Sequence, residues 1–136
     1  MAELFFPDVS LVWSLQRLIG PGLLYHIFTN DHNVTLTDTL ASFTEATYSG
    51  YAPINVAAAA WSMTSVTNHL GGIAAPTIAF FNISGSSYKA FGFFVTDTTG
   101  AQLVAASRFD DAPITVAPGA FVPVVPELGS YSGLEP

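Results

Sequence analysis

Two apolar runs on either side of a short polar segment form the clearest pattern in this sequence. The runs are Ala90–Val95 and Leu103–Ala106, and the segment Thr96–Ala101 between them reads TDTTGA. Aromatic and β-branched residues favour strands, while Asp and Gly tolerate the backbone angles of tight turns. The first run is apolar almost throughout, as a buried helix also is, but its short length and Gly92 favour a strand. The pattern predicts a β-hairpin around which the other segments are organised.

Six further short segments have the composition of strands and are bounded by turn residues. They are Leu23–Thr29, Ile54–Ala58, Trp61–Thr67, Pro76–Asn82, Ile114–Val116 and Phe121–Val125. With the hairpin they give about eight strands, which predicts an all-β sandwich of jelly-roll or immunoglobulin-like kind. Neighbouring side chains on a strand point to opposite faces, so at least one of Phe93 and Phe94 is expected in the core. The segment Asn68–Gly72 is expected to be a loop.

One short helix is predicted near the N-terminus, over Val9–Ile19. Asp8 is a suitable N-cap, and Gly20 supplies a stop signal. The helix would place on one face Leu11, Leu15, Leu18 and Ile19. Around it, residues 1–8 are expected to form an arm, residues 9–126 a single β domain, and residues 127–136 a loosely ordered tail rich in Pro, Gly and Ser.

Charge restricts the classes of partner. Half of the 136 residues are hydrophobic, 10% are charged, and the net charge is −7. The three cationic side chains, Arg17, Lys89 and Arg108, are scattered and cannot make the basic patch that nucleic acids or anionic membranes require. A weakly charged surface is typical of proteins that pack permanently against other proteins. The chain has no cysteine, which excludes disulfides and thiolate chemistry.

No spacing of polar residues marks a catalytic, metal or cofactor site. His26 lies in an apolar strand and is expected to be a partly buried structural residue, while His32 and His69 lie in predicted loops that could meet. Neither the spacing of a calcium loop nor a pairing for glycoside chemistry is found among Glu45, Asp97, Asp110 and Asp111. The sequence has no G-x-S-x-G motif and no Gly-rich phosphate loop. We therefore expect a protein that is not an enzyme and that holds no metal or cofactor.

Aromatic residues leave a carbohydrate-binding alternative open. Tyr48, Tyr51, Trp61 and Tyr88 could form a platform, because the apolar face of a sugar stacks on an aromatic ring. The same residues also suit the core of a β-sandwich or a subunit interface, and this second interpretation is favoured.

The order of segments resembles that of a group of small structural proteins of tailed bacteriophages and cyanophages. The similarity runs over residues 10–128, and its most specific parts are Phe43–Ala52 and Gly92–Phe109. It rests on a helix ending in LQRLIG, a strand with FTND, the segment FTEATYSGYA, the hairpin FGFFVTDTTGAQLVAASRFDDAPITV and the closing VPVVPEL. The resemblance implies a virion component and no catalytic residues.

The resemblance further implies a head decoration or cement protein on the capsid surface, whose partner is the major capsid protein. We also expect a homo-oligomer, and a trimer in particular, because it would match the three-fold junctions of a capsid. Residues expected at interfaces are Leu4, Phe5, Phe6, Trp13, Tyr48 and Tyr51. The alternative function is that of a tail or fibre module that binds a host-surface glycan.

Overall fold

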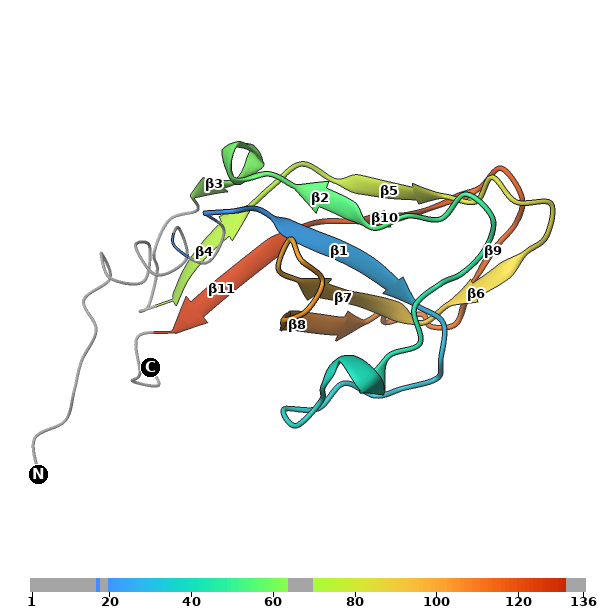
Figure 1. Ribbon diagram of the computed structural model, residues 1–136, viewed down its shortest axis with the longest axis horizontal. Coiled ribbons are helices and arrows are strands. Elements are labelled where there is room, and N and C mark those ends of the chain that lie inside the picture. Colours follow the sequence, from blue (N-terminus) through green and yellow to red (C-terminus); the bar gives the residue numbers. More distant parts are fainter. Residues whose placement is uncertain (1–16, 18–19, 64–69, 132–136) are drawn as a thin grey trace, which may run out of the picture. The chain divides into compact units, whose positions relative to one another are not determined.

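The computed structural model describes residue 17 and residues 20–63 and 70–131. These residues form β-strands and two short 3-10 helices, and β1 with β7, β7 with β8, β5 with β10, β6 with β9 and β4 with both β3 and β11 pair antiparallel (Figure 1). The predicted all-β class is therefore confirmed, while the jelly-roll or immunoglobulin-like type stays a prediction. The helix expected over Val9–Ile19 lies outside the described residues except for Arg17.

The chain forms two compact units. The larger unit contains residues 23–55 and 78–124, and the described residues of the smaller unit are 17, 20–22, 56–63, 70–77 and 125–131. The predicted domain over residues 9–126 contributes to both units. Each unit is described separately below.

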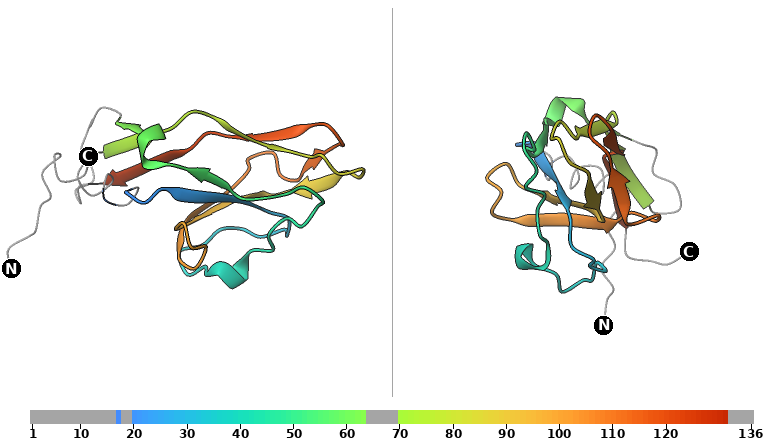
Figure 2. Two further views of the ribbon diagram at one scale, coloured as in Figure 1. Left: turned by 45° about the horizontal axis from the view of Figure 1, so that its top comes forward. Right: turned by 90° about the vertical axis from the view of Figure 1, so that its right-hand side faces the viewer.

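The strands of the larger unit form one four-stranded sheet and two two-stranded ribbons, and only one residue of the sheet, Val56, belongs to the smaller unit. The sheet has the order β2-β1-β7-β8. Its strands are Ile54–Val56, Leu23–Phe28, Gly92–Thr96 and Leu103–Arg108, respectively. One ribbon joins β5 to β10, and the other joins β6 to β9 (Figure 2). These four strands are Ile78–Phe81, Phe121–Val124, Tyr88–Ala90 and Ile114–Val116.

The predicted hairpin is present as β7 and β8, with Phe94 opposite Ala106 and Gly92 opposite Arg108. The apolar run that was predicted to form its first strand is nevertheless divided, because Ala90 ends β6 and Gly92 begins β7. Glycine permits this change of partner. A Cβ atom at Gly92 would collide with the carbonyl oxygen of Ser107 and with the ring of Phe28. Position 92 can therefore pair within the sheet only without a side chain.

Three aromatic rings form the core beneath the hairpin. Phe43 lies between Phe28 and Phe94, with ring centroids 5.0 Å and 5.1 Å apart. Phe94 is only 4% exposed, and Phe93, on the other face of β7, is half-buried. The expectation that at least one of these two rings lies in the core is confirmed. Packed around the cluster are Val34, Leu40, Phe91, Leu103 and Ala106.

The smaller unit contains a three-stranded sheet in which β4 (Leu70–Ala74) lies between β3 (Ser62–Met63) and β11 (Glu127–Tyr131). The loop predicted over Asn68–Gly72 is therefore wrong at its C-terminal end. The two glycines of β4, Gly71 and Gly72, pair with Ser130 and Gly129 of β11, whereas β3 pairs with Ile73 and Ala74.

Two further predictions fall in this unit. Residues 127–131 of the tail that was expected to be loose form β11, and residues 132–136 lie outside the described part. Of the strand expected over Trp61–Thr67, the structure describes β3 and not residues 64–67. A 3-10 helix, Ala58–Ala60, precedes it, where the sequence predicted the end of a strand.

Replacing Phe94 with Ala should lower the free energy of unfolding by about 3–5 kcal/mol, because the change leaves a cavity beside Phe43 and removes a buried ring. Phe93→Ala provides the matched control, since the Phe93 ring is only partly buried and its loss should cost distinctly less. Urea unfolding of both variants measures the two values. Equal losses would show that the hairpin does not bury the Phe94 face.

Candidate functional site

A polar network crosses the sheet beside the aromatic core. His26 on β1 is buried, and its ring stacks on that of Phe94 with 4.5 Å between centroids. Its Nδ1 lies 2.7 Å from Oε2 of Glu45, and its Nε2 lies 2.8 Å from Oγ1 of Thr96 on β7. Both ring nitrogens therefore meet an oxygen, and the expectation that His26 is a structural residue agrees with this geometry.

Tyr51 extends the network to the backbone of β1. Its hydroxyl donates to Oε2 of Glu45 at 2.8 Å and accepts the amide hydrogen of Ile27 at 3.0 Å. Burial raises the pKa of Tyr51 above its usual value, and the hydrogen bond to the Glu45 carboxylate acts in the same direction. The phenol thus stays neutral and keeps both hydrogen bonds over the ordinary pH range. Through these contacts the irregular segment Phe43–Ala52 is held against the sheet.

The order Thr96–His26–Glu45 has the chemistry of a nucleophile, a base and an orienting carboxylate. Burial argues against that use, because Thr96 has no exposed surface. In addition, the Thr96 hydroxyl donates to the carbonyl oxygen of Asp97 at 2.9 Å. A substrate could not reach this hydroxyl without separating strands, so the cluster stabilises the fold.

The loop after β1 is held by a second set of polar contacts. Asp38 accepts hydrogen bonds from Nε2 of His32 at 2.9 Å and from the amide of Thr35 at 2.8 Å. The Thr35 amide is the main cause of a pKa for Asp38 that is lowered to about 2. Nearby, Arg108 donates to Oδ1 of Asp31 at 2.7 Å. These contacts order the loop and occupy the oxygens of Asp38.

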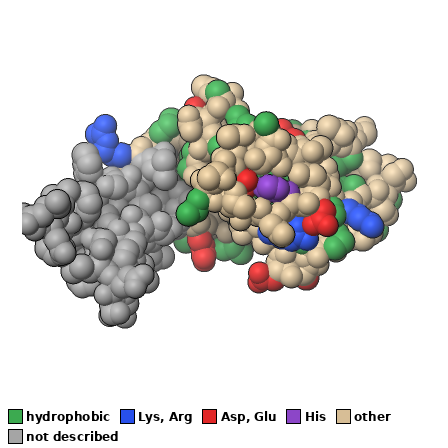
Figure 3. All heavy atoms as spheres, turned by 90° about the horizontal axis from the view of Figure 1, so that it is seen from below, with side chains coloured by type: hydrophobic (Ala, Val, Ile, Leu, Met, Phe, Trp, Pro, Cys, Tyr) green, Lys and Arg blue, Asp and Glu red, His purple; other side chains and the backbone are tan. Residues whose placement is uncertain are grey.

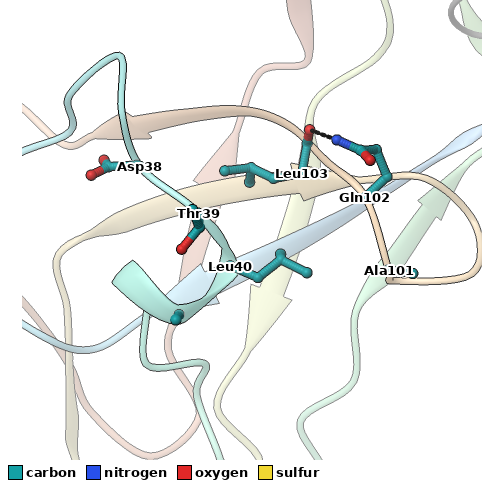
Figure 4. A pocket seen from close by; sticks show the side chains of 7 residues that line it. Asp38, Thr39, Leu40, Ala101, Gln102 and Leu103 are labelled. Atoms are coloured by element: carbon teal, nitrogen blue, oxygen red, sulfur yellow. Dashed lines mark hydrogen bonds between the residues drawn. The ribbon is translucent and has the colours of Figure 1, made fainter.

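A cavity of about 480 Å³ lies between this loop and the turn of the hairpin (Figure 4). Leu40 enters it from the loop and Leu103 from β8, while the side-chain amide of Gln102 donates to the carbonyl of Leu103 at 3.1 Å. Because the oxygens of Asp38 are already occupied, this cavity offers few free polar groups to a ligand. Among the described residues no group of three His, Cys, Asp or Glu side chains could hold a metal ion. His69, which lay in a predicted loop that could meet that of His32, is outside the described residues.

The ribbon β5–β10 presents apolar side chains to solvent. Phe81 and Phe121 are direct cross-strand partners, and their rings lie 5.2 Å apart. They are 55% and 51% exposed, and Ile83, two residues beyond Phe81, is 72% exposed. We call Phe81, Ile83 and Phe121 the ribbon face. The opposite side of the ribbon is buried through Phe80, Val122 and Val124.

Ile83 is placed on this face by a glycine. Gly50 has a φ angle of 84°, in the left-handed region, and a Cβ atom there would collide with the Ile83 side chain. Both strands of the ribbon lie in uncharged sequence, since the chain has no Asp, Glu, Lys or Arg from residue 46 to 88 or from 112 to 126. Figure 3 shows another side of the molecule, seen from below, on which most of the described surface is uncharged and some acidic and basic side chains lie side by side. The ribbon face is the strongest candidate for a protein-binding surface.

Of the predicted interface residues, the structure places two. Tyr48 is half-buried, its ring stacks on Tyr88 at 4.2 Å, and its hydroxyl donates to the carbonyl of Phe81 at 3.2 Å. Tyr51 is turned toward the internal network described above. The others, Leu4, Phe5, Phe6 and Trp13, lie outside the described residues.

Sequence reasoning missed the ribbon face itself. Pro76–Asn82 was predicted as a strand, but Phe80 and Phe81 are both Phe, so composition does not say which ring is exposed. The segment Phe121–Val124 is apolar at every position, so its sequence shows no alternation, although exposed Phe121 and Pro123 alternate with buried Val122 and Val124 in the structure.

In comparisons with protein-family models, with curated proteins and with solved structures, no match to this chain was found. Within the part of the chain that the structure describes, no helix has the length and apolar character needed to cross a membrane.

Replacing Tyr51 with Phe should lower the free energy of unfolding by about 1–3 kcal/mol, because the buried amide of Ile27 loses its acceptor. Tyr48→Phe is the matched control, since its hydroxyl donates to a carbonyl in a more exposed setting and should cost under about 1 kcal/mol. Chemical denaturation of both variants gives the comparison. A larger loss for Tyr48→Phe than for Tyr51→Phe would contradict the assigned role of the network.

Acid should weaken the fold partly through Asp38. Its pKa falls from 3.8 to about 2 in the folded protein, so the carboxylate contributes stability above about pH 4 that disappears as the pH falls toward 2. Asp38→Asn should therefore flatten the decline of the melting temperature between pH 4 and pH 2. Thermal melting across this range tests it, with Asp110→Asn, an exposed acid outside the loop, as control. An unchanged slope for Asp38→Asn would remove Asp38 as a source of acid sensitivity.

Proposed function

We propose that this protein is a non-enzymatic structural component of a phage virion, and that it decorates the head by binding the lattice of the major capsid protein. The observation that carries the proposal is the ribbon face, on which Phe81, Ile83 and Phe121 are each at least half exposed. Large apolar side chains gathered on one uncharged ribbon are typical of a surface that another protein covers.

Energetics favour a permanent contact at this face. Complete burial of a Phe or Ile side chain is worth about 1.5–3 kcal/mol, and these three retain half or more of their exposure for a partner to cover. An interface of standard size also has to offset the loss of translational and rotational freedom. Repetition over a lattice then multiplies a modest gain per copy.

Charge points in the same direction. With a net charge of −7, copies of the chain repel one another wherever acidic side chains face each other. The ribbon face avoids this repulsion because its two strands carry no charged residue. The choice of a capsid as the partner lattice rests on the resemblance to small virion proteins, and a homotrimer at three-fold positions remains part of the proposal. The apolar arm Leu4–Phe6 is proposed as a second contact.

The proposal is tested by placing a charge on the ribbon face. Phe121→Glu, and separately Phe81→Glu, should reduce occupancy on heads from a phage with this gene disrupted by about tenfold or more, since a carboxylate would be buried without a partner. Leu36→Glu is the matched control, because Leu36 is fully exposed in the loop after β1. Occupancy is measured by co-sedimentation and cryo-electron microscopy.

Full occupancy by both ribbon variants would exclude the ribbon face as the capsid contact. Failure of the wild-type protein to bind heads, together with binding to tails, would move the protein to another part of the virion. Circular dichroism and thermal melting of each variant ensure that a loss of binding is not a loss of folding.

A further inference from the structure

A second cavity in the larger unit has a different chemistry from the ribbon face. It measures about 330 Å³ and is lined by Thr29, Thr47, Tyr48, Tyr88 and Lys89. Its size lies at the lower end of the range for small-molecule sites. Its wall therefore combines two aromatic rings, two aliphatic hydroxyls and one ammonium group.

Neighbouring residues fix the orientation of the two tyrosine rings. The Tyr48 and Tyr88 rings stack with an interplanar angle of 17°, and the Tyr88 hydroxyl donates to that of Tyr48 at 3.4 Å. Tyr48 also meets Tyr51 in an edge arrangement at 5.3 Å, and Tyr51 is anchored to Glu45. The Tyr88 ring is partly buried, lines the cavity and is held against Tyr48 on one face. Such a ring is prepared to stack on a ligand with little loss of conformational freedom.

Lys89 supplies an available hydrogen-bond donor at the same place. Its side chain is exposed on β6, and in the described part of the chain no carboxylate lies within salt-bridge distance of it. Arg108, by contrast, is paired with Asp31. The cross-strand partner of Lys89 on β9 is Thr115, which is uncharged. The ammonium group can thus donate to an oxygen-rich ligand without breaking a contact within the described residues.

We propose that this cavity is a carbohydrate-binding site that holds one sugar unit of a glycan. The Tyr88 ring would stack on the apolar face of the sugar, while Lys89 would donate to its oxygens and Thr47 would bond them. The Thr29 hydroxyl donates to the carbonyl of Thr44 at 3.2 Å, so it would accept from a sugar hydroxyl. A polyphosphate ligand fits less well, because one lysine in a chain of net charge −7 gives no cluster of cations. This site is separate from the capsid contact, so a decoration protein would also carry a means of holding the virion near a saccharide-coated surface.

The full-length protein is titrated with two probes of equal length, a neutral hexasaccharide and a uronic-acid hexasaccharide, and binding is followed by two-dimensional NMR. We expect shifts centred on Thr47, Tyr48, Tyr88 and Lys89 with at least one probe. Tyr88→Leu should weaken binding about tenfold, whereas Tyr88→Phe, which keeps the ring, should bind within about twofold of wild type. Lys89→Gln distinguishes an acidic from a neutral glycan ligand. It should weaken binding of the acidic probe about tenfold and binding of the neutral probe much less.

The proposal would be overturned if neither probe bound at a concentration of about 10 mM, because the dissociation constant would then be too high for specific recognition. Equal binding by Tyr88→Leu and wild type, or shifts centred away from the cavity, would do the same. Asp110→Asn is the matched control for Lys89→Gln, because it changes one exposed charge that does not line the cavity. Lys89 is exposed, so its variant tests the site even where Tyr88→Leu lowers stability.

Discussion

The packing of Phe43 between Phe28 and Phe94 is the interaction on which the larger unit depends. It brings a segment without regular secondary structure into the core of the sheet, 15 positions along the chain from Phe28. With Phe43 packed in this position, Glu45 lies beside His26, and the Tyr51 hydroxyl accepts a hydrogen bond from the amide of Ile27. The apolar contact supplies the driving force, and the polar contacts select one arrangement of the segment, because buried polar groups need particular partners.

The contacts that hold the segment Phe43–Ala52 against the sheet also position residues at the surface. Tyr48 lies between Glu45 and Tyr51 in the sequence, so holding those two residues also fixes its ring against Tyr88. The Tyr48 hydroxyl donates to the carbonyl of Phe81, at the end of β5. Gly50, in the same segment, leaves room for Ile83. The segment therefore connects the aromatic core to the tyrosine-lined cavity and to the ribbon face, and it carries the residues that determine both surfaces.

Aromatic residues serve opposite purposes in different parts of the larger unit. Phe28, Phe43 and Phe94 are buried and stabilise the fold, while Phe81 and Phe121 are exposed although they have the same chemistry. Exposure of the second pair reduces the gain from burial in the isolated chain. A protein that spends its working life covered by a partner recovers this free energy on assembly. The low charge of the sequence is consistent with a covered surface, since charged residues are depleted at the centre of protein interfaces.

The sequence by itself determined the all-β class and the β7–β8 hairpin, because aromatic and β-branched runs bounded by turn residues have a strong local preference. It also placed His26 in a strand as a partly buried structural residue. The tertiary structure alone decided the break at Phe91, the strand through Gly71 and Gly72, and the strand at residues 127–131. Each of these depends on a partner distant in sequence: the Phe28 ring at Gly92, and the pairing of β4 with β11. The same limit applies to the candidate sites. Composition showed that Tyr48, Phe81 and Tyr88 were aromatic, but only the folded chain places the tyrosines around a cavity and turns Phe81 outward, because exposure depends on which face of a strand another segment covers.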